Sequence, residues 1–207
     1  MSVRRVVRLP LEQLQPYLLA PPDPPGALVW SEVFGNDRPI EIEVGFGKGL
    51  FLVTAGQERP DVNFLGIEIE RKYYLFTANR VAKRQMHNVR LVCTDARALL
   101  RDCVPAASVQ ALHVYFPDPW WKKRHHKRRL FTEEFAALCA RVLGQGGNLE
   151  VVSDVPEYFA IITEMLGRQP RLVLQADVEH SETYRTNFER KYRAAGKPIY
   201  GASYRVG

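Results

Sequence analysis

Cysteine is scarce in this 207-residue sequence. Cys93, Cys103 and Cys139 lie far apart and form no CxxC spacing, which disfavours a disulfide framework and a zinc knuckle. Low cysteine content of this kind is typical of a reducing compartment. Adjacent His125 and His126 cannot easily reach one ion together, and no acid follows at ligand spacing. We therefore expect no metal site.

Long apolar runs are also absent, so the sequence predicts neither a membrane span nor a signal peptide. Near the N-terminus Arg4, Arg5 and Arg8 interrupt the apolar residues. We expect a cytoplasmic protein without a membrane partner. Lys and Arg number 29 against 23 Asp and Glu, and the net charge of +6 favours a polyanionic partner.

A proline cluster divides the chain. Regular secondary structure is interrupted by Pro21, Pro22, Pro24, Pro25 and Gly26. We expect residues 1–39 to form a partly flexible N-terminal arm. Residues 40–207 should form one compact domain, because an apolar content of 46% in a chain of this length suits a single core.

From Ile40 onward, short apolar runs alternate with helical patterns, which indicates a parallel sheet covered by helices. The predicted strands are Ile40–Val44, Asn63–Ile67, Val89–Cys93, Val109–Tyr115 and Asn148–Val152. The predicted helices are Arg71–Arg84, Phe131–Leu143, with Thr132 as N-cap and Gly144 as stop, and a third that begins at Pro156. Arg171–Val178 and Pro198–Tyr204 should pair as antiparallel strands. The expected fold class is α/β, a mostly parallel doubly wound sheet with an antiparallel C-terminal edge strand.

Glycines follow the first predicted strand, in Glu43-Val44-Gly45-Phe46-Gly47-Lys48-Gly49. Glycine at a strand-to-helix turn allows positive φ angles and lets a ligand approach the backbone closely. Glu68 ends the second strand, where an acid can accept hydrogen bonds from both hydroxyls of a ribose, and Asp95 follows the third. Acids at successive strand ends line the edge at which doubly wound sheets bind ligands.

The glycine spacing favours S-adenosylmethionine over a dinucleotide. A pyrophosphate usually meets GxGxxG at a helix N-terminus, whereas here the third glycine comes one residue early and Leu50 takes the sixth place. Glu43 would repel a pyrophosphate, but it would attract the cationic sulfonium and ammonium of S-adenosylmethionine. These residues predict that 40–207 is a Rossmann-like class I S-adenosylmethionine-dependent methyltransferase domain.

An acid between two prolines follows the fourth strand, in Phe116-Pro117-Asp118-Pro119-Trp120-Trp121. The two rings narrow the local backbone and so fix the direction of Asp118. The two tryptophans offer flat apolar surface for an unstacked base. The following run has a cation density suited to phosphate contacts, from Lys122, Lys123, Arg124, Lys127, Arg128 and Arg129.

With these residues the chain resembles the bacterial tRNA (guanine-N7-)-methyltransferase family. The resemblance runs from Ile40 to the C-terminus, through Glu43–Gly49, Gly66–Glu68, Phe116–Arg129, Ser153-Asp154 and Thr186–Glu189. It implies methyl transfer from S-adenosyl-L-methionine to N7 of guanine 46 in the tRNA variable loop. It implies donor contacts from Glu43, Glu68, Asp95 and Asp118, the last with the catalytic role. It also implies RNA contacts from Lys122, Asp154, Thr186, Asn187, Phe188 and Glu189.

Guanine N7 carries a lone pair and no hydrogen, so positioning should govern the rate without a base that removes a proton. Whether Asp118 binds the guanine edge or orients the donor stays open, as does the choice between monomer and homodimer. Three alternatives are an exocyclic-amine methyltransferase, a tRNA-binding module without activity, and a nicotinamide enzyme. The first normally has two consecutive prolines after its polar residue, the second should lack a donor acid, and Glu43 disfavours the third.

Overall fold

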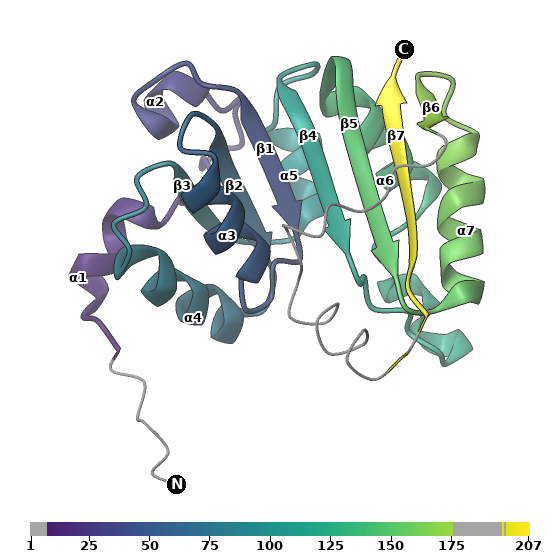
Figure 1. Cartoon of the computed structure of the whole chain (residues 1–207), viewed down its shortest axis with the longest axis horizontal. Helices are drawn as coiled ribbons and strands as arrows, with labels where there is room; N and C mark the ends of the chain where they lie inside the picture. Colours follow the sequence, from purple (N-terminus) through teal and green to yellow (C-terminus); the bar gives the residue numbers. More distant parts are fainter. Residues whose placement is uncertain (1–7, 176–195, 197) are drawn as a thin grey trace, which may run out of the picture.

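A seven-stranded sheet forms the centre of the computed structural model, which describes residues 8–175, 196 and 198–207 (Figure 1). The strand order is β3-β2-β1-β4-β5-β7-β6. The parallel strands are β1 (Ile40–Val44), β2 (Asn63–Glu68), β3 (Val89–Cys93), β4 (Val109–Tyr115) and β5 (Leu143–Ser153). Strands β2 and β3 extend the sheet on one side of β1, and β4 continues it on the other. The strand order therefore reverses between β1 and β4, which is where ligands bind in doubly wound sheets.

Two late strands complete the sheet. β7 (Tyr200–Val206) runs antiparallel to both of its neighbours, β5 and β6 (Leu172–Gln175). The predicted antiparallel pair is confirmed, but β6 is outermost and β7 lies one place inside the edge. The strand predicted over Arg171–Val178 ends at Gln175, and positions 176–178 lie outside the described residues.

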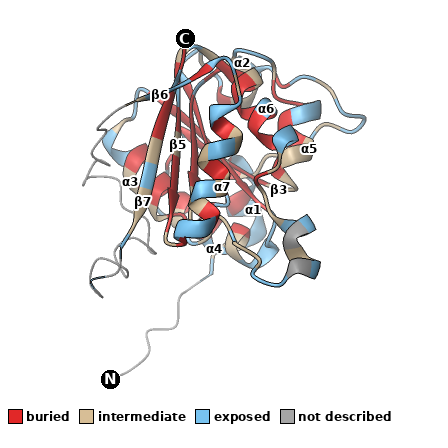
Figure 2. Cartoon of the chain, turned by 90° about the vertical axis from the view of Figure 1, so that its right-hand side faces the viewer, coloured by how far each residue is buried: buried red, intermediate tan, exposed pale blue. Residues whose placement is uncertain are grey.

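Helices cover both faces of the sheet, as the doubly wound prediction requires. One apolar cluster includes residues of α1 (Leu11–Leu14), the 3-10 helix η1 (Gln15–Tyr17), α3 (Leu50–Glu58) and α4 (Arg71–Ala82). The other includes residues of α2 (Trp30–Phe34), α5 (Ala96–Asp102), α6 (Glu133–Val142) and α7 (Pro156–Gly167). A second 3-10 helix, η2, spans Lys123–Arg128. Figure 2 shows the buried residues gathered along the sheet and on the helix faces turned toward it.

The residues of strand β1 alternate between the two faces of the sheet. Ile40, Ile42 and Val44 belong to the cluster under α5, α6 and α7. Successive side chains of a strand point to opposite faces, so Glu41 and Glu43 point to the face that α3 and α4 cover. Both glutamates are buried there. A strand that carries two buried acids on one face is unusual, and it places charge at the centre of the molecule.

The ends of α6 test two predictions. Thr132 is the N-cap as predicted, and its Oγ1 accepts a hydrogen bond from the Phe135 backbone N–H at 3.1 Å. The helix stops before Gly144 as predicted, but one residue earlier than its predicted end at Leu143. The helix ends at Val142, and Leu143 is already extended, at φ −71° and ψ 132°, because it pairs with Val109 of β4. Gly144 lies inside β5.

The N-terminal segment packs on the domain where the structure describes it. Leu14, Tyr17, Leu28 and Phe34 are buried, and the Leu19 N–H donates to the Leu91 carbonyl at 2.8 Å. The division of the chain at residue 39 stays a prediction. Among the described residues, no helix has the length and apolar character needed to cross a membrane.

Candidate active site

Three glycines in the left-handed region shape the turn between β1 and α3. Their φ angles are 74° at Gly45, 50° at Gly47 and 61° at Gly49. A Cβ added to Gly45 or Gly47 would meet no heavy atom within 4 Å. At Gly49, in contrast, a Cβ would lie 2.2 Å from Cγ2 of Thr77 in α4. The turn is therefore anchored to α4 at its third glycine and open at the first two.

Glu68 holds this turn in place. Its Oε2 accepts a hydrogen bond from the Gly47 N–H at 2.8 Å, and its Oε1 accepts one from the Glu70 N–H at 2.9 Å. Thr77 Oγ1 donates to the Gly47 carbonyl at 3.0 Å, and Arg80 donates to the Lys48 carbonyl. The structure thus brings Glu68 and the glycines together, as their positions at neighbouring strand ends predicted. Each carboxylate oxygen keeps a further lone pair for a ligand hydroxyl.

Glu43 lies at the end of β1 with only 3% of its surface exposed. The Leu52 backbone N–H, in the first turn of α3, lowers the pKa of this carboxyl slightly. Its Oε2 has no hydrogen-bond partner in the part of the chain that the structure describes. Burial raises the pKa of Glu43 to about 8, against the attraction of His113. A buried oxygen without a partner costs free energy, and a cationic ligand group would remove that cost.

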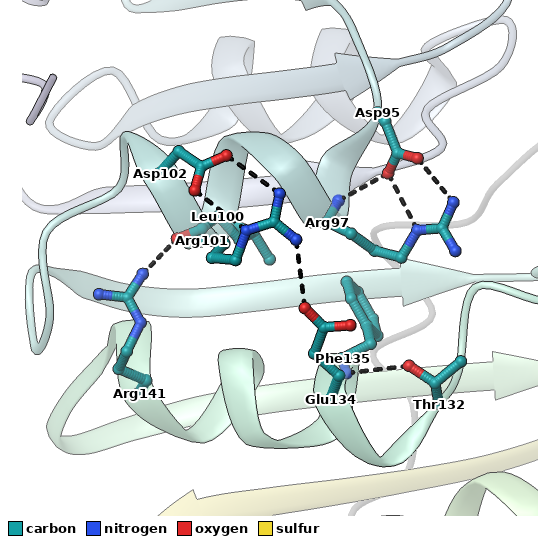
Figure 3. Close-up of polar contacts among 9 residues, drawn as sticks. All are labelled: Asp95, Arg97, Leu100, Arg101, Asp102, Thr132, Glu134, Phe135 and Arg141. Atoms are coloured by element: carbon teal, nitrogen blue, oxygen red, sulfur yellow. Dashed lines mark hydrogen bonds and ion pairs between the residues drawn. The ribbon is translucent and has the colours of Figure 1, made fainter. Parts of the chain in front are cut away.

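Arg97 holds Asp95 at the start of α5 with both its backbone and its side chain (Figure 3). Its Oδ1 caps the helix by accepting from the Arg97 backbone N–H at 2.8 Å. The Arg97 guanidinium binds both carboxylate oxygens, through Nε at 3.1 Å and Nη2 at 2.6 Å. The hydrogen bond from the Arg97 side chain lowers the pKa of Asp95, so the carboxylate stays ionised at the sheet edge. The sequence interpretation favoured a ligand role for Asp95 over helix capping, and the structure shows that Asp95 caps α5.

Asp118 is exposed and follows β4, on the other side of the point where the strand order reverses. Two non-glycine residues around it are in the left-handed region, Phe116 at φ 52° and Trp120 at φ 46°. The Phe116 N–H donates to the Val152 carbonyl at 2.7 Å and ties the loop to β5. Backbone strain of this kind is uncommon and persists only where surrounding contacts impose it.

The basic run divides into cations that hold this loop and cations that face outward. The Arg129 Nε donates to the Pro119 carbonyl at 2.7 Å, and its guanidinium lies 4.9 Å from the centre of the Tyr158 ring. Arg128 lies 5.1 Å from the centre of the Trp120 ring. The exposed members of the run include Lys122, Arg124 and Lys127, and only the backbone of Lys123 is described. Trp121 is 68% exposed.

For the predicted RNA-binding residues after β5, the structure describes only the position of Asp154. Asp154 follows β5 at the same sheet edge and is partly exposed. The N–H of Val155 bonds to Ser153 Oγ at 3.2 Å, so Ser153 and not Asp154 satisfies it. Thr186, Asn187, Phe188 and Glu189 lie outside the described residues. Within the described ranges, no three His, Cys, Asp or Glu side chains form a group that could hold a metal ion.

Sequence reasoning missed a buried polar network beside Glu43. Arg59 binds Glu41 through two hydrogen bonds, at 2.6 and 2.9 Å. His113 Nε2 lies 3.0 Å from Glu41 Oε2, and His113 Nδ1 lies 2.9 Å from the Tyr115 hydroxyl. That hydroxyl donates to Glu150 Oε2 at 2.8 Å. The available signal was the two-residue spacing of polar side chains in otherwise apolar strands, Glu41 with Glu43 and His113 with Tyr115.

The comparisons with known proteins agree with this geometry. A family model described as "Putative methyltransferase" matches residues 37–202. A tRNA (guanine-N(7)-)-methyltransferase of Rhodopirellula baltica is 40% identical, over 95% of this chain and 76% of the relative. The enzyme of that name from Bacillus subtilis is 35% identical, over 84% of this chain and 83% of the relative.

A solved structure described as the 16S rRNA methyltransferase KamB has a TM-score of 0.63 at 14% identity, over 86% of this chain and 92% of that one. At this identity the likeness shows the Rossmann-like methyltransferase fold. The family model and the sequence identities go further, since they cover most of both chains. The chain belongs to the bacterial tRNA (guanine-N7-)-methyltransferase family.

Proposed function

We propose that this protein transfers a methyl group from S-adenosyl-L-methionine to N7 of guanine 46 in the variable loop of tRNA, in the cytoplasm. The observation that carries the proposal is the Glu43 carboxyl, which is buried beside an open glycine turn and has one oxygen without a partner among the described residues. The names of the family members support the substrate class and the methylated atom.

The side of the proposed site that binds the methyl donor is acidic and is formed by Glu43, Glu68 and Asp95. S-adenosyl-L-methionine, when bound, supplies an electrophilic methyl group on a positively charged sulfur. Glu43 would accept the ammonium group of the donor, and Glu68 its ribose hydroxyls. The Leu52 N–H at the start of α3 favours the charged form of Glu43, so this end of the helix serves an acid and not a phosphate. Open space at Gly45 and Gly47 supports backbone contact with the donor.

Asp118 forms the side of the proposed site that binds guanine, the methyl acceptor. Guanine N7 needs no base to remove a proton, so the task of the protein is to hold the base in line with the methyl group. A carboxylate that accepts hydrogen bonds from N1 and N2 of guanine would orient the ring. It would also stabilise the positive charge that develops on the purine. The strained backbone at Phe116 and Trp120 supports a fixed direction for Asp118.

RNA contacts are proposed on either side of Asp118. Exposed cations of the basic run would bind phosphates, while Arg128 and Arg129 also hold the loop through Trp120 and Pro119. Lys122 and Asp154, with the segment of Thr186, Asn187, Phe188 and Glu189, are proposed to contact the substrate nucleotide. The proposed chemistry uses no metal.

Methylation of an unmodified tRNA transcript with labelled S-adenosyl-L-methionine tests the proposal. Nuclease digestion and aniline cleavage should locate N7-methylguanosine at position 46, and Asp118→Asn should reduce its formation at least about 100-fold, the scale for losing one preorganised electrostatic contact. Asp37→Asn is the matched control, because Asp37 is exposed and precedes β1 at the opposite sheet edge. Methyl transfer to another atom would refute the acceptor assignment, and transfer unaffected by Asp118→Asn would refute the role of that residue.

A further inference from the structure

The hydrogen bonds around His113 define its protonation state. Tyr115 donates its only hydroxyl hydrogen to Glu150, so its oxygen must accept from His113 Nδ1–H. On the other side of the ring, both Glu41 oxygens accept from Arg59, which marks Glu41 as ionised, so Nε2 must also carry a hydrogen. Both ring nitrogens are therefore donors, and His113 is an imidazolium cation.

This cation is buried next to Glu43. His113 is 5% exposed and is the register partner of Glu43 across β1 and β4. Neighbouring strands are about 4.8 Å apart, so the two side chains point to the same face within range of a strong charge interaction. The Phe51 ring, centred 4.5 Å from the His113 ring, covers this face from α3. Burial of the pair away from water strengthens the attraction.

We propose that His113 is a positioning residue for methyl-donor binding: its imidazolium, held between Glu41 and Glu150, favours the charged form of the neighbouring Glu43 carboxyl, the form that accepts the ammonium group of the donor. This inference rests on the proposed function. Glu43 lies between two opposing influences, because Glu68 of β2 disfavours its charge and His113 of β4 favours it. Without the cation, burial and the second acid would raise the pKa of Glu43 further, and its charged form would be rarer at neutral pH.

The groups that face this pair determine the pH range. Glu41 and Glu43 face His113 from β1. Tyr115 faces it from its own strand β4, and Glu150 faces it from β5. Arg59 forms hydrogen bonds with Glu41. Burial alone would lower the pKa of His113, but its ion pairs with Glu150 and Glu41 raise it to about 9. Since the pKa of Glu43 is raised to about 8, His113 stays charged while Glu43 loses its proton. Donor affinity should therefore rise as pH increases through about 8.

The experiment measures the dissociation constant of S-adenosyl-L-methionine by calorimetry from pH 6 to 9, without tRNA. His113→Gln keeps a planar polar side chain and removes the charge. We expect its affinity to fall about tenfold at pH 7 and the rise in affinity to move to higher pH, because loss of a nearby cation shifts a carboxyl pKa by about one or more. The amino group of the donor titrates in the same range, so Glu43→Gln provides the reference curve.

A double-mutant cycle separates charge from structural damage. In the Glu43→Gln background, His113→Gln should leave donor affinity unchanged, and an equal loss in both backgrounds would overturn the proposal. Tyr115→Phe removes one hydrogen bond and keeps the cation, so its pH profile should match the parent. An unshifted profile in His113→Gln would also overturn the proposal. If Glu43→Gln itself binds the donor normally, the assignment of Glu43 in the proposed function fails instead.

Discussion

Position 49 requires glycine for two separate reasons: its φ angle is positive, and a Cβ there would clash with Thr77. Replacing it with alanine should lower the free energy of unfolding by roughly 2–4 kcal/mol, the sum of left-handed strain and overpacking. Urea unfolding followed by circular dichroism measures the loss. Because the same residue anchors the open glycine turn to α4, we also expect weaker donor binding.

Gly35 provides the matched control for this substitution. It has a φ of 73° at the end of α2, and an added Cβ would meet nothing within 4 Å. Gly35→Ala should therefore cost only the backbone strain, about 1–2 kcal/mol. Equal losses in the two variants would contradict the role given to the Thr77 contact.

Single residues also mark where sequence reasoning was sufficient and where it was not. Glu43 and Glu68 were identified because they end strands beside glycines, and that pattern is local in the sequence. His113 was not, since its partners Glu41 and Glu150 lie on two other strands, 72 positions before it and 37 after it by their residue numbers. A charge state that depends on such distant partners follows only from the folded arrangement.

Among the elements, α6 shows how one side chain sets a helix start. Thr132→Ala removes the hydrogen bond to the Phe135 N–H and should lower the free energy of unfolding by about 1 kcal/mol. Thr132→Ser keeps the hydroxyl oxygen and should retain most of that stability. The two variants are compared by urea unfolding, and an unchanged value for Thr132→Ala would contradict the cap assignment.

The predicted strands show which parts of an element a sequence determines. β1, β3 and β4 have the predicted bounds, because turn residues or charges flank each apolar run. β5 begins five residues earlier than predicted, at Leu143 instead of Asn148, because its glycine-rich start pairs with β4 through an irregular register. Glycine signals a break by local propensity, and here tertiary pairing overrides that propensity. The prolines before residue 27 likewise gave no sign that Leu14 and Tyr17 are buried.

At the scale of the whole molecule, the proposed tRNA surface should appear in the salt dependence of binding. Lys122 and Lys127 are exposed beside the Asp118 loop. Replacing both with alanine should weaken tRNA binding and reduce the slope of log affinity against log salt by about two, since each phosphate contact contributes about one. Filter binding over a range of KCl concentrations gives the slope.

Arg38 and Arg101 supply the comparison for that measurement. Arg38 precedes β1, and Arg101 lies in the last turn of α5, so both belong to the opposite edge of the sheet. Replacing both with alanine removes the same net charge, and the slope should not change. If the two double variants reduce the slope equally, the effect is one of overall charge and the basic run is not the RNA surface.

The position of β7 has a consequence for how the chain is made. Among the described strands, β6 is hydrogen-bonded only to β7, and β7 follows it by more than twenty residues. While the ribosome has not yet released residues 200–206, β5 has no neighbour on that side and β6 has no strand to join. The first five strands can assemble during synthesis, whereas the last two must be added together. Protease sensitivity of nascent chains should therefore drop in two stages, the second only after Val206 has emerged.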